Sequence, residues 1–484
     1  MAKSIRVNFI YNVINTVSGL IFPLITYPYV FRILLADGVG QVNFYNSIIS
    51  YITLLTGLGI PLYGIREIAR VRDDIKELTQ TTVEILSLNL LLNIVGYVVV
   101  FILCFTVEDI RQDYPLFLLL SISIILTTIG CPWFYNGIED FKFVTLRGIA
   151  VRIICTVFLF VAVKTKQDLY WYGLYYVLVS TGNYIVNFLF LRKRISVGLI
   201  KWSDLNIGKH IKPALAVFIF NLITSIYLNL DKLMLGFIKD AQAVGYYTAA
   251  TQLSHVFLTL ATALGAVMLP RSSNLIKTGQ IEEFYRLSNK SYNFILMLTM
   301  PFCFGCMVMS PVLIHLFCGP SYEPSITTLK IICPIIVALG MSNLIGMQML
   351  YPLGKINIVT ISTCVGAALN LVLNLCLIPL LAQDGAAIAT VAAEVSVTTT
   401  QIVLARKYIC FNPISKEFLR YFSSAFVMSV VCFFIIQIRT PDILLLFVVP
   451  FIGALVYLSI LLIFKDKLVI EIFNTLKLKI SHYV

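Results

Sequence analysis

Long apolar stretches alternate with short polar segments along the whole chain. A helix that crosses a bilayer needs about 20 predominantly apolar residues, and the chain offers about fourteen windows of this kind. They fall at about residues 9–35, 39–64, 79–103, 114–137, 143–163, 168–191, 213–235, 243–269, 289–317, 325–351, 356–381, 385–405, 417–438 and 442–464. The pattern predicts an all-α, polytopic membrane protein with about 14 transmembrane helices.

The composition favours the same class of protein. Hydrophobic residues make up 59% of the 484 residues and charged residues only 12%, whereas a soluble protein carries about 25% charged residues. Most of the eleven cysteines lie in apolar runs, and Cys303 and Cys306, although spaced as in metal sites, have no further ligands nearby. The apolar stretch after the opening MAKSIR is too long for a signal peptide, so we expect it to be the first span.

The placement of basic residues predicts the topology. If the N-terminus is cytoplasmic, about 26 of the 36 lysines and arginines fall in cytoplasmic segments and about five in outer loops. This asymmetry is the positive-inside pattern, and it predicts that both termini are cytoplasmic. The net charge of +12 is therefore explained by topology, and nucleic acid is not needed as a partner.

Two segments 205 residues apart resemble each other. Residues 39–66 and 244–271 both open with Val-Gly and close with an arginine, Arg66 or Arg271. The repeat predicts two six-helix lobes, residues 1–200 and 201–410, followed by two appended helices and a cytoplasmic tail in residues 411–484. Duplicated lobes of like orientation are typical of transporters whose site lies near the bilayer midplane between the lobes.

Several charged residues fall inside the apolar windows, where each costs about 2.5–3.5 kcal/mol on insertion scales and therefore calls for a partner or a role. The expected substrate-binding cations, which include the two repeat arginines, are Arg32, Arg66, Arg271, Arg147, Arg152 and Lys232. The acids that could couple transport to an ion are Asp231, Glu394 and Glu84. His255 and His315 are read as packing residues.

A purely structural role stays open as the alternative for several of these residues. Arg66 and Arg271 could anchor helix ends by reaching the cytoplasmic interface, or they could line the inner mouth of a cavity. Arg32 follows Pro23 and Pro28, which are expected to break the first span, as in the broken helices that line cavities. Glu394 lies among small residues that suit close helix packing as well as ion coupling.

A cationic cavity implies an anionic cargo. Arginine binds phosphate groups through two parallel hydrogen bonds, so a diphosphate would match several of these side chains. Polar residues in the first span, which could satisfy sugar hydroxyls, are Asn8, Tyr11, Asn12, Asn15 and Thr16. The sequence contains no ATP-binding P-loop, no G-x-S-x-G nucleophile elbow and no HExxH motif. We therefore expect a carrier without a cofactor. Whether H⁺ or Na⁺ is coupled to transport stays open.

Three stretches resemble the bacterial flippases of O-antigen and capsular polysaccharide repeat units. They are Pro28–Leu34 with Gly38, Gly40, Tyr51, Gly57, Gly59 and Tyr63–Arg70; Trp133–Glu139; and Asp231–Gly236 with Val244–Tyr247. This family belongs to the multidrug, oligosaccharidyl-lipid and polysaccharide exporter superfamily. The resemblance implies a V of two lobes in the bacterial inner membrane, which turns an undecaprenyl-diphosphate-linked oligosaccharide from the cytoplasmic to the periplasmic leaflet. It also implies a monomer that works beside polysaccharide polymerase machinery.

Three other functions fit the sequence less well than a repeat-unit flippase. A cation-coupled multidrug antiporter of the same superfamily would favour acids over bases in its cavity, and a lipid II flippase would share the fourteen spans. A membrane polymerase or ligase would need a large outer loop with catalytic groups, and every outer loop here is expected to be short. The sequence therefore favours a flippase that performs no covalent chemistry.

Overall fold

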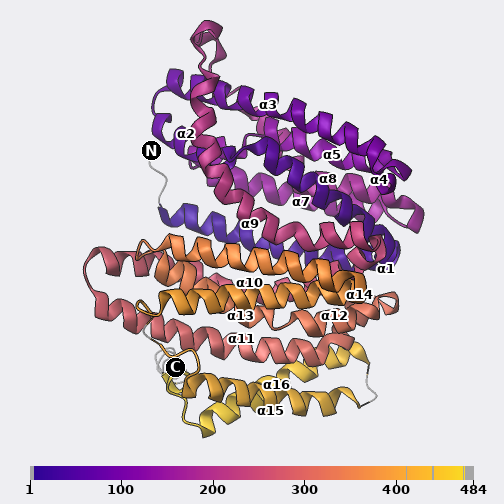
Figure 1. Ribbon diagram of the computed structural model, residues 1–484, viewed down its shortest axis with the longest axis vertical. Coiled ribbons are helices and arrows are strands. Elements are labelled where there is room, and N and C mark those ends of the chain that lie inside the picture. Colours follow the sequence, from indigo (N-terminus) through magenta and orange to yellow (C-terminus); the bar gives the residue numbers. More distant parts are fainter. Residues whose placement is uncertain (1–4, 410, 439–440, 472–473, 475–484) are drawn as a thin grey trace, which may run out of the picture. The chain divides into compact units, whose positions relative to one another are not determined.

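The computed structural model describes residues 5–409, 411–438, 441–471 and 474. Within these ranges the side chains of residues 5–10, 12, 13, 16, 20, 141, 202, 219–228 and 260–267 are not described. The described chain is almost entirely helical and contains no β-strand (Figure 1). The all-α prediction is confirmed.

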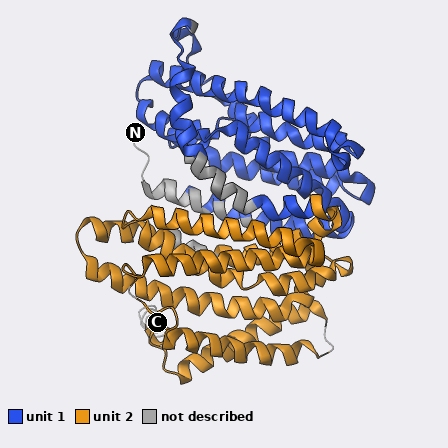
Figure 2. Cartoon of the chain, in the orientation of Figure 1, with its two compact units in different colours: residues 1–236 blue, residues 237–484 orange. Residues whose placement is uncertain are grey.

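The chain divides into two compact units, Met1–Gly236 and Phe237–Val484 (Figure 2). The helices of unit 1 are α1 (Ile5–Gly57), α2 (Ile60–Val71), α3 (Ile75–Thr106), α4 (Glu108–Gln112), α5 (Tyr114–Ile129), α6 (Pro132–Gly137), α7 (Phe141–Ala162), α8 (Leu169–Leu191) and most of α9 (Ile211–Ile238). The helices of unit 2 are α10 (Ala241–Lys277), α11 (Ile281–Phe317), α12 (Pro324–Ile332), α13 (Ile335–Asn343), the π-helical η6 (Leu344–Leu350), α14 (Ile356–Ala405), α15 (Lys416–Ile436) and α16 (Asp442–Ile463). The division into repeated lobes stays a prediction, because compactness does not test duplication.

Ten described segments are long and apolar enough to cross a membrane. Two of them, Val17–Val71 and Ile356–Ala405, each hold two of the predicted windows. At the boundary between the two windows, each segment has a residue with non-helical backbone angles, Leu35 or Ala382. The windows 213–235 and 243–269 lie on α9 and α10, and every predicted window lies on one or more helices.

The first long segment breaks after the prolines and not at them. Helix α1 continues through Pro23 and Pro28, and its backbone leaves the helical region at Leu35, with φ 58° and ψ −174°. A proline removes only one backbone hydrogen bond, and membrane helices tolerate this loss when neighbouring groups compensate. The expectation that Pro23 and Pro28 break the span was therefore wrong, and Arg32 lies in the turn before the true break.

A dense aromatic core joins α2, α3 and α6 inside unit 1. Tyr63, Trp133, Phe134 and Tyr135 are all at most 4% exposed. Gly64 is required here because a Cβ atom at this position would lie 2.8 Å from the indole of Trp133. This core fixes the short helix α6 against α2, and both helices carry residues of the candidate site.

Candidate functional site

Arg32 and Arg66 both have exposed side chains in the structure. Arg66 lies on α2, with its Nε atom 3.1 Å from Glu67 Oε1 and its guanidinium 5.5 Å from the centre of the Tyr63 ring. Arg70 pairs with the same carboxylate oxygen, also at 3.1 Å. Pairs this exposed contribute little to stability, so the guanidinium of Arg66 can exchange its partner for a ligand at small cost.

Lys232 and Asp231 occupy adjacent positions on α9 but differ in surroundings. Asp231 is 6% exposed, and Lys232 Nζ lies 3.4 Å from the Oδ1 atom of Asn43 on α1. Nearby, a Cβ atom on Gly236 would overlap the ring of Phe44. Lys232 thus helps to hold α9 against α1 within unit 1.

The predicted residues of unit 2 lie in contrasting places. Arg271 is exposed on α10, directly after Pro270. Glu394 is 4% exposed on α14. His255 is exposed and His315 is half-buried. No group of three metal-binding side chains occurs within the described residues.

Arg152 ties α7 to α1. Its Nη1 atom donates hydrogen bonds to the Asn15 carbonyl at 3.2 Å, to Asn15 Oδ1 at 3.1 Å and to Ser18 Oγ at 2.5 Å. Asn15, which was expected to meet sugar hydroxyls, therefore contacts Arg152. The side chains of Asn8, Asn12 and Thr16 lie outside the described residues.

We expect Arg152→Met to lower the free energy of unfolding by about 1.5–3 kcal/mol, the range for hydrogen bonds made by a charged group. Thermal unfolding of the detergent-purified protein measures the change. Arg111→Met is the matched control, since Arg111 is 61% exposed and its pairing with Glu108 is loose at 3.7 Å. Equal destabilisation by the two variants would contradict a structural role for Arg152.

Glu84, expected to couple an ion, is fully buried on α3 and accepts hydrogen bonds from four groups. Gln80 Nε2 and the Asn206 backbone N–H donate to Oε1 at 3.0 and 2.9 Å. Lys209 Nζ and His210 Nε2 lie 2.6 and 2.9 Å from Oε2. These donors satisfy the charged carboxylate and fasten the connection between α8 and α9 to α3.

His210 extends this network to α2. Its Nδ1 atom lies 2.6 Å from the hydroxyl of Tyr63, and its side chain is 3% exposed. Sequence reasoning did not single out Lys209 or His210 as partners of Glu84. The available signal was a buried carboxylate that needed a donor and a long basic connection between the sixth and seventh windows.

Arg147 differs from the other cations because it is buried, with 9% exposure. Its guanidinium lies 5.7 Å from the ring centre of Tyr135 and 5.0 Å from that of Phe143. Its Nε and Nη1 atoms have no hydrogen-bond partner within the described part of the chain. The structure thus separates Arg147 from the exposed Arg32, Arg66 and Arg271.

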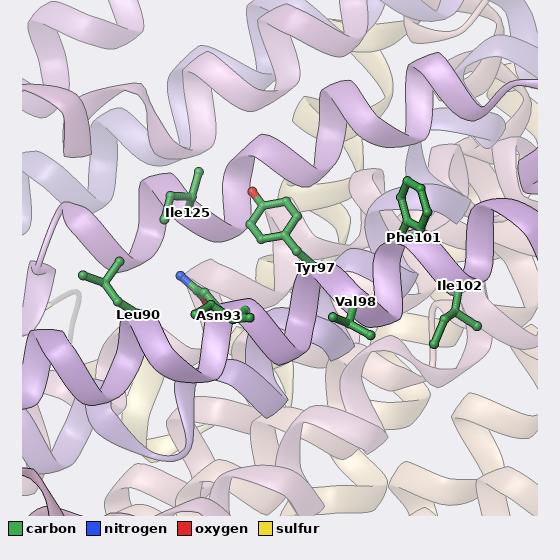
Figure 3. Close-up of a pocket in the computed structure, with 8 residues that line it drawn as sticks. Leu90, Asn93, Tyr97, Val98, Phe101, Ile102 and Ile125 are labelled. Atoms are coloured by element: carbon green, nitrogen blue, oxygen red, sulfur yellow. The ribbon is translucent and has the colours of Figure 1, made fainter.

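Each unit also carries an apolar groove. A hollow of about 690 Å³ in unit 1 lies along α3 and α5, with Asn93 and Tyr97 among residues such as Leu90, Val98 and Phe101 (Figure 3). In unit 2, a groove of about 470 Å³ lies among α10, α11, α15 and α16 and is lined by apolar side chains such as Phe257, Met309, Met428 and Leu446. Both grooves suit hydrocarbon chains better than polar solutes.

Comparison with known sequences identifies the family. The profile of the "Polysaccharide biosynthesis protein" family matches residues 5–276, and that of the "Lipid II flippase MurJ" family matches residues 149–453. The "Putative O-antigen transporter" of Escherichia coli (strain K12) is 23% identical over 406 residues, which are 83% of this chain and 97% of that protein. The "Probable flippase AglR" of Haloferax volcanii is 28% identical over 44% of this chain and 45% of its own length.

Solved structures show the same fold. A lipid II flippase MurJ in an inward closed conformation superposes with a TM-score of 0.73 and 16% identity, covering 95% of this chain and all of that one. An inward-facing multidrug resistance transporter of the MATE family gives 0.60 and 14%, covering 83% and 94% of the two chains. The chain belongs to the polysaccharide biosynthesis protein family, and it is a multi-pass membrane transporter of the flippase superfamily rather than an enzyme.

Proposed function

We propose that the protein flips an undecaprenyl-diphosphate-linked oligosaccharide from the cytoplasmic to the periplasmic leaflet of a bacterial inner membrane by alternating access. The observation that carries the proposal is the match to the "Putative O-antigen transporter" of Escherichia coli over 97% of that protein's length. The exposed guanidinium groups of Arg32 and Arg66 support it, because they can bind a diphosphate through paired hydrogen bonds. Both termini lie in the cytoplasm in this proposal.

The apolar part of the cargo also finds matching chemistry. The groove among α10, α11, α15 and α16 is lined almost wholly by apolar groups, so a polyprenyl chain can pack there by van der Waals contact as it does in the surrounding lipid. Moving a dianion outward across an inside-negative membrane releases about 4.6 kcal/mol per 100 mV. We therefore propose that the membrane potential contributes to export, without a dedicated H⁺ or Na⁺ site.

The double variant Arg32→Gln with Arg66→Gln tests this function. We expect it to abolish surface polysaccharide in a host whose own repeat-unit flippase is deleted, at an unchanged protein level. The matched control is Arg70→Gln, which removes a cation that pairs with the same Glu67 oxygen and is 63% exposed. Full surface polysaccharide in the double variant would reject the cationic site.

A lipid II flippase is the second candidate, favoured by the MurJ profile over residues 149–453. The two candidates share a diphosphate carrier and differ in the attached glycan. Rescue of a cell depleted of its lipid II flippase, together with failure to restore O-antigen, would support the second candidate over the first. We expect the opposite result.

A further inference from the structure

The connection between α8 and α9 carries a basic and partly apolar segment that takes no part in the proposed cargo site. Residues 192–201, here called the basic loop, read RKRISVGLIK and contain four basic residues and no acid. All four cations are exposed, namely Arg192, Lys193, Arg194 and Lys201. Val197 and Leu199 are also exposed, at 43% and 51%. Exposed cations combined with exposed apolar side chains are typical of a segment that contacts a membrane surface.

Most of the positive charge of the basic loop is not neutralised by the protein. Arg194 pairs with Asp140 at 2.7 Å, although its side chain remains 49% exposed. The ammonium group of Lys193 lies 4.9 Å from the centre of the Phe190 ring, a contact that leaves the charge uncompensated. The other two cations form no ion pair with any residue that the structure describes. The loop therefore presents a surplus of positive charge to its surroundings.

Two hydrogen bonds fix the depth of the basic loop. The Ser196 N–H donates to Thr79 Oγ1, and Gln80 Nε2 donates to the Asp204 carbonyl, both at 3.1 Å. Thr79 and Gln80 lie at the start of the membrane-spanning segment Ile75–Thr106. Five residues of helix rise about 7.5 Å, and the headgroup region is about 5–8 Å thick on each side of the hydrocarbon core. The two attachments thus hold the loop at the level of the lipid headgroups.

The direction in which the connection extends favours lipid over protein as its partner. Figure 1 shows the connection between α8 and α9 projecting beyond α3, away from the other helices of unit 1. A stable protein interface buries about 1,200–2,000 Å² of surface, whereas the basic loop offers only two exposed apolar side chains. A lipid surface needs no such area, because each phosphate group and each acyl chain is contacted separately.

We propose that the basic loop docks on the headgroups of anionic phospholipids in the leaflet beside it, which is the cytoplasmic leaflet in the predicted topology. Its cations contact the phosphate groups, and Val197 and Leu199 enter the boundary between headgroups and acyl chains. An anionic surface attracts every basic residue that lies within a Debye length of it. The contact concerns the lipid of the bilayer and not the cargo, so it goes beyond the proposed function.

Hydrogen–deuterium exchange of the full chain tests the contact in nanodiscs of phosphatidylcholine alone and of phosphatidylcholine mixed equally with phosphatidylglycerol. We expect the peptide that covers residues 195–203 to exchange at least five-fold more slowly in the mixed lipid, the change that one basic residue near an anionic surface contributes. At about 1 M salt, where the Debye length is about 3 Å, the difference between the two lipids should vanish.

A pair of double variants assigns the effect to the cations of the basic loop. Lys193→Gln with Lys201→Gln should reduce the difference between the two lipids to less than two-fold. The matched control is Lys164→Gln with Lys166→Gln, which removes the same charge from two exposed cations in the connection between α7 and α8. The control should keep the full difference at residues 195–203, because its substitutions lie outside the basic loop.

Three results would overturn the proposal. The first is equal exchange of the wild type in the two lipids, and the second is a difference that survives both the lysine substitutions and high salt. The third is protection that occurs only in nanodiscs cut from native membranes, because a protein would then cover the loop. Unchanged exchange of α3 shows that a variant is folded, and the salt arm on the wild type needs no variant. None of these measurements depends on transport.

Discussion

Replacing Glu84 with leucine is expected to lower the free energy of unfolding by about 3–5 kcal/mol, the range for removing one partner of a buried ion pair. The carboxylate is fully buried and holds four donors. Its removal leaves Nε2 of the buried His210 without a partner and detaches Asn206 and Lys209 from α3. Thermal or denaturant unfolding in detergent micelles measures the loss.

Glu283→Leu is the control for this variant. Glu283 pairs with Arg286 at 2.8 Å, but this pair lies at the surface, with side chains 33% and 79% exposed. Removing it should cost about 1 kcal/mol or less, as for exposed pairs. If Glu84→Leu is no more harmful than Glu283→Leu, the network does not anchor the connection between α8 and α9.

Gly59→Ala is expected to cost about 2–5 kcal/mol through backbone strain and overpacking. Gly59 precedes α2 with φ +72°, a conformation that residues with a Cβ atom adopt at a cost. An added Cβ atom would lie 2.5 Å from the Ala214 carbonyl oxygen and 2.6 Å from the Phe218 nitrogen. Both are backbone atoms of α9, so the clash is relieved only by moving a helix.

Gly279→Ala separates the two causes. Gly279 has φ +73°, but no atom lies within 4 Å of a Cβ built there. Its replacement should therefore cost only the backbone strain of about 1–2 kcal/mol. Equal unfolding temperatures for the two variants would show that α9 does not pack closely on the start of α2.

The helices could be predicted from the sequence because a membrane span is recorded locally, in about 20 consecutive apolar residues. The break at Leu35 could not, since it depends on packing within the folded protein, whereas the nearby Pro28 gave a strong but misleading local signal. The same difference separates the finding that Glu84 is buried from the identity of its partners. Lys209 and His210 lie more than a hundred residues further along the chain.

The candidate cations show a similar limit. The position of a cation in or beside an apolar window marks it as a candidate. It does not tell whether the guanidinium is buried or exposed in the folded protein. Arg152 satisfies its donors on α1, Arg147 leaves two unmet, and Arg66 is exposed beside an acid. These differences depend on which neighbour faces each side chain, and only the folded arrangement determines that.

The connection between α8 and α9 is attached to α3 on both sides of an exposed turn at Gly198. The Ser196 N–H donates to Thr79 Oγ1 at 3.1 Å, and Gln80 Nε2 donates to the Asp204 carbonyl at 3.1 Å. Between these two attachments, a Cβ atom at Gly198 would meet nothing within 4 Å. A polypeptide severed at Gly198 would therefore keep both new ends tethered to α3, which makes this peptide a natural place to divide the gene into two co-expressed halves.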